Sequence, residues 1–144
     1  MQATKLRGRR NPLTKRDSSE ETSTAVPRLR RVRILVANEP RAYRTALAPA
    51  LQGLRPGAEV TSLEPEAIDR EIERLAPDLV ICSRATEAVR NMALSWIELH
   101  PDGAPQSVIS VRGQRSKVPG LDLAGILATI DETERLLGCV SGRS

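Results

Sequence analysis

The pattern of apolar and polar positions changes abruptly at about residue 31. Before that point large apolar side chains are almost absent, whereas residues 32–37 form an apolar run interrupted only by Arg33. A short run rich in branched residues is typical of a strand buried on both faces of a parallel sheet. We therefore expect a folded domain over residues 31–138, preceded by a disordered basic tail at residues 1–30.

Helical and extended patterns alternate through the next fifty residues. From Pro40, apolar residues recur at helical spacing as far as Leu54, which predicts a helix after the first strand. Residues 58–63 alternate as an edge strand does. The helix expected next carries three apolar residues one turn apart, Ile68, Ile72 and Leu75. Residues 79–82 are then a second buried strand, entered through Pro77-Asp78.

A third helix is expected beyond that strand. Thr86 is a suitable N-cap, and five apolar residues then recur at helical spacing, Val89, Met92, Ala93, Trp96 and Ile97. Residues 107–111 predict the fourth strand. Only four residues separate it from Ser116, too few for a crossover helix, so an antiparallel hairpin at the sheet edge is expected over 107–118. Gly113 can supply the positive φ of its turn.

The last predicted element is a helix that begins after Asp122 and ends at Gly138. Asp122 is a favourable N-cap, and a glycine commonly stands just past a helix end. The inward face of this helix is expected to carry Leu123, Ile126, Leu127, Ile130 and Leu137. Residues 139–144 are expected to be a disordered C-terminus.

This order of elements predicts an α/β fold of the flavodoxin-like kind. We expect a three-layer α/β/α sandwich around a mostly parallel central sheet, with the hairpin at one edge. In such a fold, ligands and chemistry lie at the carboxyl ends of the first and third strands. Those ends are Asn38-Glu39 and Ser83-Arg84 in this chain.

Two segments resemble a response-regulator receiver domain. Ile34-Leu35-Val36-Ala37-Asn38-Glu39, followed by Tyr43-Arg44 and Leu47, is similar to the first strand and helix of that family. Pro77-Asp78-Leu79-Val80-Ile81-Cys82-Ser83 is similar to its third strand. The resemblance covers about residues 31–100. It implies two acidic residues at the first strand end to hold Mg²⁺, and an aspartate at the third to accept phosphate.

This chain departs from the receiver pattern at the positions that carry the chemistry. Asn38 and Glu39 fall on the acidic pair, and Ser83 falls on the phosphate acceptor. An unactivated serine hydroxyl cannot replace a carboxylate that forms an acyl phosphate. We therefore expect a degenerate crevice at Asn38, Glu39 and Ser83, with no catalytic residue, no metal ligand and no cofactor.

A receiver-like fold without the phosphate-accepting residues predicts the function of a pseudo-receiver. We expect a non-phosphorylatable protein-interaction module in bacterial signal transduction or regulation, whose partner is a signalling protein of unknown identity. An enzyme is not expected, because the sequence contains neither a phosphate-cradling glycine loop nor a nucleophile elbow.

The charge distribution supports a different alternative. Residues 1–33 hold ten Lys and Arg against three Asp and Glu, a net charge of +7, whereas the remaining residues carry −3 of the total +4. A basic tail of this kind allows weak nonspecific contact with nucleic acid, so the alternative is a nucleic-acid-associated regulatory protein. Binding of that kind would depend strongly on salt and would disappear when residues 1–30 are removed.

Apolar run length and cysteine spacing indicate the cellular compartment. No run approaches the roughly 18 apolar residues that a membrane span needs, and the N-terminus lacks the apolar core of a secretory signal. A cytoplasmic location is therefore expected, without membrane contact. Cys82 and Cys139 are far apart in sequence and are expected to be reduced, unpaired thiols.

Overall fold

Short apolar runs form strands and periodic segments form helices in the computed structural model, which describes residues 31–100 and 105–143. The strands are β3 (Arg33–Ala37), β4 (Glu59–Ser62), β5 (Leu79–Cys82), β6 (Ser95–Glu98), β7 (Ser107–Val111) and β8 (Gln114–Val118). The helices are α1 (Arg41–Leu54), α2 (Ile68–Leu75), α3 (Glu87–Met92) and α4 (Leu123–Arg143), with a 3-10 turn, η1 (Pro65–Ala67), before α2. The tail expected at residues 1–30 lies outside the described residues.

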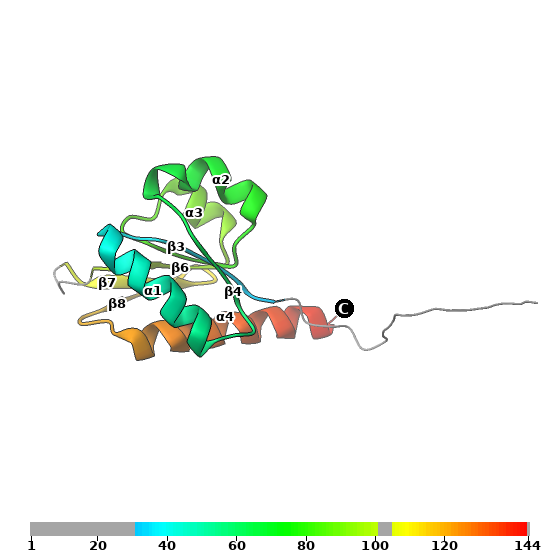
Figure 1. Ribbon diagram of the computed structural model, residues 1–144. Coiled ribbons are helices and arrows are strands. Elements are labelled where there is room, and N and C mark those ends of the chain that lie inside the picture. Colours follow the sequence, from blue (N-terminus) through cyan, green and yellow to red (C-terminus); the bar gives the residue numbers. More distant parts are fainter. Residues whose placement is uncertain (1–30, 101–104, 144) are drawn as a thin grey trace, which may run out of the picture. The chain divides into compact units, whose positions relative to one another are not determined.

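The strands form one mixed sheet in the order β4-β3-β5-β6-β7-β8 (Figure 1). Strands β4, β3, β5 and β6 are parallel to one another, whereas β7 pairs antiparallel with both β6 and β8. Each parallel connection requires a crossover, and α1, α2 and α3 provide these crossovers in turn. The expected α/β class is therefore confirmed for the unit formed by residues 31–139.

Helices cover both faces of the parallel half of the sheet. Because successive strand residues point to opposite faces, Ile34 and Val36 of β3 pack with α1 and α4, whereas Leu35 packs with α2 and α3. Figure 1 shows α2 and α3 together on one side of the sheet and α1 and α4 on the other. None of the helices in the described ranges combines the length and apolar character that crossing a lipid bilayer requires.

Strand β6 corrects the helix expected over residues 86–97. The helix begins after Thr86, whose hydroxyl accepts a hydrogen bond from the Val89 N–H, but it ends at Met92. Trp96 and Ile97 then lie in a strand that pairs with β5 on one side and β7 on the other. Residues 107–111 are consequently the fifth strand of the described sheet rather than the fourth, and Met92, expected to be buried, is 47% exposed.

The expected hairpin over 107–118 is confirmed. Strands β7 and β8 pair from Ser107 opposite Val118 to Val111 opposite Gln114. Arg112 and Gly113 form the connection with φ values of 53° and 83°. Two successive positive φ angles are typical of the type I′ turn, whose twist matches that of the two strands it joins.

The final helix begins as expected but extends further. The Asp122 carboxylate accepts a hydrogen bond from the Gly125 N–H at 3.0 Å, which confirms the N-cap. The helix continues through Gly138 to Arg143, so the expected helix end was wrong and residues 139–143, expected to be disordered, are helical. Leu123 was expected to face inward, but it is 38% exposed.

The thiol of Cys82 is enclosed at the end of β5. It is 1% exposed and donates a hydrogen bond to the Ile97 carbonyl with an Sγ to O distance of 3.6 Å. Burial raises the pKa of this thiol to about 12, and the nearby Glu98 carboxylate adds to the rise. Since the thiolate is the nucleophile, the folded protein holds Cys82 in an unreactive form. The side chain of Cys139 lies outside the described residues.

We predict that Cys82 resists alkylation in the native protein. At pH 8 a thiol with this pKa should react about a thousandfold more slowly than an ordinary cysteine, before any effect of access. Peptide mapping after iodoacetamide treatment tests this, with protein unfolded in guanidinium chloride as the control that must be fully labelled. Rapid labelling of Cys82 in the native protein would show that the end of β5 opens readily.

Candidate functional site

The carboxyl ends of β3 and β5 meet at one edge of the sheet, as the sequence predicted. The Ser83 hydroxyl, one residue beyond β5, accepts a hydrogen bond from the Glu39 backbone N–H at 2.7 Å. Asn38 lies between β3 and Glu39 along the chain. The three residues that the resemblance singled out, Asn38, Glu39 and Ser83, are therefore neighbours in the fold, and we call this place the crevice.

Asn38 is the most enclosed residue of the crevice. Its exposure is 0%, and neither the amide nitrogen nor the amide oxygen of its side chain has a hydrogen-bond partner. Within the described ranges these are the only fully buried side-chain nitrogen or oxygen atoms without a partner. A buried polar group without a partner costs free energy, so an apolar side chain would be more favourable at this position. The presence of Asn38 is therefore not explained by packing alone.

Arg44 adds a buried cation to the crevice. It lies on the first turns of α1, on the same helix face as the buried Leu47 and Leu51, and its side chain is 5% exposed. The guanidinium donates a hydrogen bond to the Asn38 backbone carbonyl at 3.2 Å. It also lies 3.9 Å from the Glu39 carboxylate and 3.6 Å from that of Glu64.

In the sequence, Arg44 stood out only as part of the family resemblance, and its place in the crevice was not predicted. A signal was present, since Arg44 occupies the first position of the stripe that continues with Leu47, Ala48 and Leu51. A charged residue on an apolar helix stripe is rarely buried without partners. That position alone could have identified Arg44 as a residue paired inside the fold.

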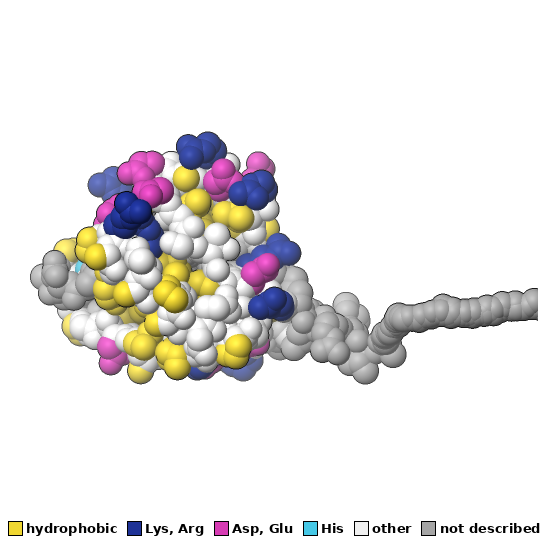
Figure 2. Space-filling view, in the orientation of Figure 1, with side chains coloured by type: hydrophobic (Ala, Val, Ile, Leu, Met, Phe, Trp, Pro, Cys, Tyr) yellow, Lys and Arg dark blue, Asp and Glu magenta, His cyan; other side chains and the backbone are white. Residues whose placement is uncertain are grey.

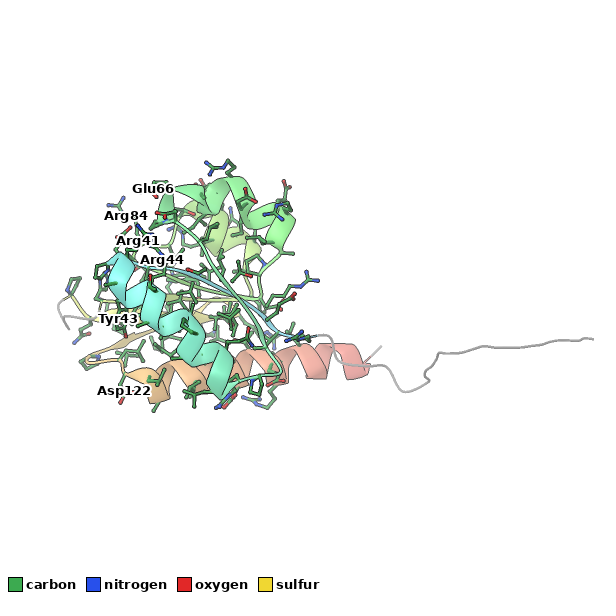
Figure 3. The ribbon with its side chains drawn as sticks, viewed as in Figure 1. Arg41, Tyr43, Arg44, Glu66, Arg84 and Asp122 are labelled. Atoms are coloured by element: carbon green, nitrogen blue, oxygen red, sulfur yellow. The ribbon has the colours of Figure 1, made fainter. Side chains whose placement is uncertain are left out.

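The wider edge around the crevice is rich in arginine. Figure 3 shows Arg44 at the start of α1, at the same end of the sheet as Arg41, Arg84 and Glu66. Arg41 and Arg84 are exposed. In the space-filling view, basic and acidic side chains lie next to each other over α2, at the top of the molecule (Figure 2). The surface near the crevice therefore carries charges of both signs.

The residues of the crevice do not fit a Mg²⁺ site. Such a site relies on several anionic oxygen ligands, but Asn38 and Ser83 supply none and the Glu39 carboxylate is already close to Arg44. In the part of the chain that the structure describes, no group of three or more His, Cys, Asp or Glu side chains is placed to hold a metal ion. Arg44 supplies a fixed positive charge beside the carboxylate that a metal would need.

The geometry also limits what Ser83 can do. A nucleophilic serine needs an adjacent general base to take its proton. The hydrogen bond found for Ser83 in the described residues comes from a backbone N–H, which is a donor and cannot act as that base. The hydroxyl therefore ties β5 to the segment after β3.

Comparison with protein-family models, curated proteins and solved structures gave no match to this chain.

Proposed function

We propose that this protein is a pseudo-receiver, a non-phosphorylatable interaction module with a flavodoxin-like fold. The proposed partner is a protein of bacterial signal transduction or regulation. The four neighbouring parallel strands support the fold assignment, because the order β4-β3-β5-β6 corresponds to second, first, third and fourth along the described chain. This is the order with which a flavodoxin-like sheet begins.

The hydrogen bond between Ser83 and Glu39 is the observation that carries the proposal. At the position of the phosphate acceptor, a hydroxyl is fixed by the backbone N–H of the segment that a receiver uses to hold its metal. Arg44 supports the same conclusion, since it provides a permanent cation within 3.9 Å of Glu39. The Ser83 hydroxyl and the Glu39 carboxylate thus have partners within the fold, which suits a module that acts through its surface.

We expect the protein to gain no phosphate from acetyl phosphate in the presence of Mg²⁺. Intact-mass spectrometry checks this, with a phosphorylatable receiver in the same reaction as the positive control. Ser83→Asp alone should also remain unmodified, because Asn38 leaves the site one carboxylate short and Arg44 is already paired with Glu39.

One outcome would overturn the proposal. If the wild-type protein gains one phosphate in a Mg²⁺-dependent manner, and the phosphate maps to Glu39 or Ser83 of the crevice, then the crevice is a working relay or enzymatic site. A phosphate mapped elsewhere on the chain would leave the crevice as proposed.

A further inference from the structure

The antiparallel half of the sheet has one face that the described helices leave open. Trp96 of β6, Val108 of β7 and Lys117 of β8 lie on this face, in the register given by the strand pairing. Helices α2 and α3 pack over β3 and β5 on the same side, while α4 covers the opposite face. A hollow of about 260 Å³ remains over the three strands, with Arg90 of α3 and Arg115 of β8 at its border.

The open face is positively charged. Arg90, Arg115 and Lys117 border the hollow together with a single acidic residue, Glu98. The Glu98 carboxylate accepts a hydrogen bond from the Ala85 N–H, so it is already engaged. No ion pair in the described residues involves Arg115 or Lys117. The side chains of Arg115 and Lys117 are thus available to an anionic partner.

The two edges of the sheet differ in how their backbone is protected. At the β4 edge, the side-chain amide of Gln52 donates to the Ala58 carbonyl at 2.7 Å and accepts from the Val60 N–H at 3.1 Å. Gln52 therefore takes up two of the backbone groups that an added strand would need, the Ala58 carbonyl and the Val60 N–H. At the other edge, β8 pairs only with β7, and its residues from Gln114 to Lys117 are exposed.

The register of the hairpin determines which backbone groups β8 offers. In a two-residue hairpin the flanking pair, Val111 and Gln114, exchanges hydrogen bonds, and the pairs alternate from there. By this alternation the N–H and C=O groups of Arg115 and Lys117 point away from β7. The residues whose backbone faces the open edge are therefore the two whose cationic side chains lie on the open face.

An acidic segment fits this edge better than a second copy or a nucleic acid does. If two copies paired through β8 in antiparallel register, Arg115 and Lys117 would face the same cations of the copy, which is destabilising. Proteins that bind single-stranded nucleic acid commonly stack its bases on exposed aromatic rings, but Trp96 is 4% exposed and lies 5.3 Å beneath the Arg115 guanidinium. A partner strand with acidic side chains would attract Arg115 and Lys117 and would not need an exposed aromatic ring.

We propose that β8 binds an extended acidic segment of a partner protein as an added strand. Residues opposite Arg115 and Lys117 stand two apart in such a strand, so the segment has acidic residues at alternate positions. The hydrogen bonds come from the backbone of β8, and the two cations select the charge and spacing. This inference rests on the proposed function, since it assigns a surface and a partner class to the interaction module.

Two synthetic peptides of equal composition test the proposal. In one, two glutamates alternate within a run of threonines (Thr-Thr-Glu-Thr-Glu-Thr-Thr), and in the other the glutamates are adjacent (Thr-Thr-Glu-Glu-Thr-Thr-Thr). Each is titrated into the ¹⁵N-labelled full chain, and amide chemical shifts are followed. We expect the alternating peptide to bind at least about threefold more tightly, because adjacent glutamates point to opposite faces of a strand. The shift changes should centre on Arg115 and Lys117.

Charge reversal provides the matched variants. The double change Arg115→Glu and Lys117→Glu should weaken binding of the alternating peptide about tenfold. The variant should instead bind a peptide that has lysines at the two glutamate positions. The control is Arg70→Glu with Arg74→Glu on α2, which changes the net charge equally at two residues whose side chains are 71% exposed. Should charge reversal unfold the hairpin, Lys117→Gln should weaken binding in the same direction.

Several results would overturn the inference. Equal affinity for the two peptides would show charge attraction without strand addition. Shift changes centred away from β8, or no shift changes with millimolar peptide, would exclude this edge as the binding site. Shift changes in β8 on addition of an oligonucleotide, but not on addition of peptide, would also exclude an acidic peptide segment as its partner. Phosphate transfer to the crevice would refute the proposed function while leaving the peptide result as it stands, so the two failures are distinguishable.

Discussion

Ile97→Ala is expected to lower the free energy of unfolding by about 2–5 kcal/mol. Ile97 is 0% exposed, and it lies in β6 between β5 and β7, on the face that packs against α1 and α4. Removing its branched side chain leaves a cavity that two paired neighbouring strands cannot easily close. Denaturant unfolding, followed by circular dichroism and by the fluorescence of the single tryptophan, measures the change.

Met92→Ala is the control for this prediction. Met92 is at the end of α3 and is 47% exposed, so its truncation should change stability by less than about 0.5 kcal/mol. A continuous helix over residues 86–97 would bury both side chains on one face, and the two variants would then be similarly destabilised. Comparable losses in the free energy of unfolding for Met92→Ala and Ile97→Ala would therefore contradict the structure and support a continuous helix over residues 86–97.

The β6 strand shows why sequence periodicity alone was insufficient here. Val89, Met92, Ala93, Trp96 and Ile97 have the spacing of a helix face. Yet Trp96 and Ile97 are buried on opposite faces of the sheet, which only an extended backbone permits. A four-residue strand is too short to show its own alternation, and pairing with β5 and β7 decides its conformation.

The hairpin of β7 and β8 at the sheet edge was predictable because a short connection alone determines it. Four residues between Val111 and Ser116 cannot form a crossover, whatever the rest of the chain does. Gly113 also accommodates the positive φ of the turn. The helix end was less predictable, since a glycine such as Gly138 can end a helix but can also lie within one.

The candidate site was predictable in its backbone but not in its side-chain partners. Asn38, Glu39 and Ser83 were expected together because the ends of parallel strands meet at one sheet edge. The contacts of Arg44 depend on where a long, flexible side chain ends in three dimensions. Its partners Asn38, Glu39 and Glu64 come from two different strand ends, and nothing in the sequence specifies that convergence.

Arg44→Ala is expected to lower the free energy of unfolding by about 2–4 kcal/mol. The substitution removes a buried aliphatic stem, and it leaves the Asn38 carbonyl without the donor that it has at 3.2 Å. The carboxylates of Glu39 and Glu64 contribute less, because their side chains are 54% and 63% exposed and remain accessible to water. Denaturant unfolding measures the loss, and Arg41→Ala, at an exposed position of the same helix turn, should change stability little.

Arg44→Met separates the packing of this side chain from its charge. Methionine retains an unbranched stem, so the variant should keep most of the packing and lose the hydrogen bond to the Asn38 carbonyl. If the guanidinium stabilises the segment after β3 through this bond, Arg44→Met should be less stable than wild type by about 1–2 kcal/mol. Hydrogen exchange of the Glu39 amide, which is bonded to the Ser83 hydroxyl, should also accelerate. A methionine variant as stable as wild type, with unchanged exchange at Glu39, would mean that Arg44 only fills space. The link between the ends of β3 and β5 would then rest on the Ser83 hydrogen bond alone.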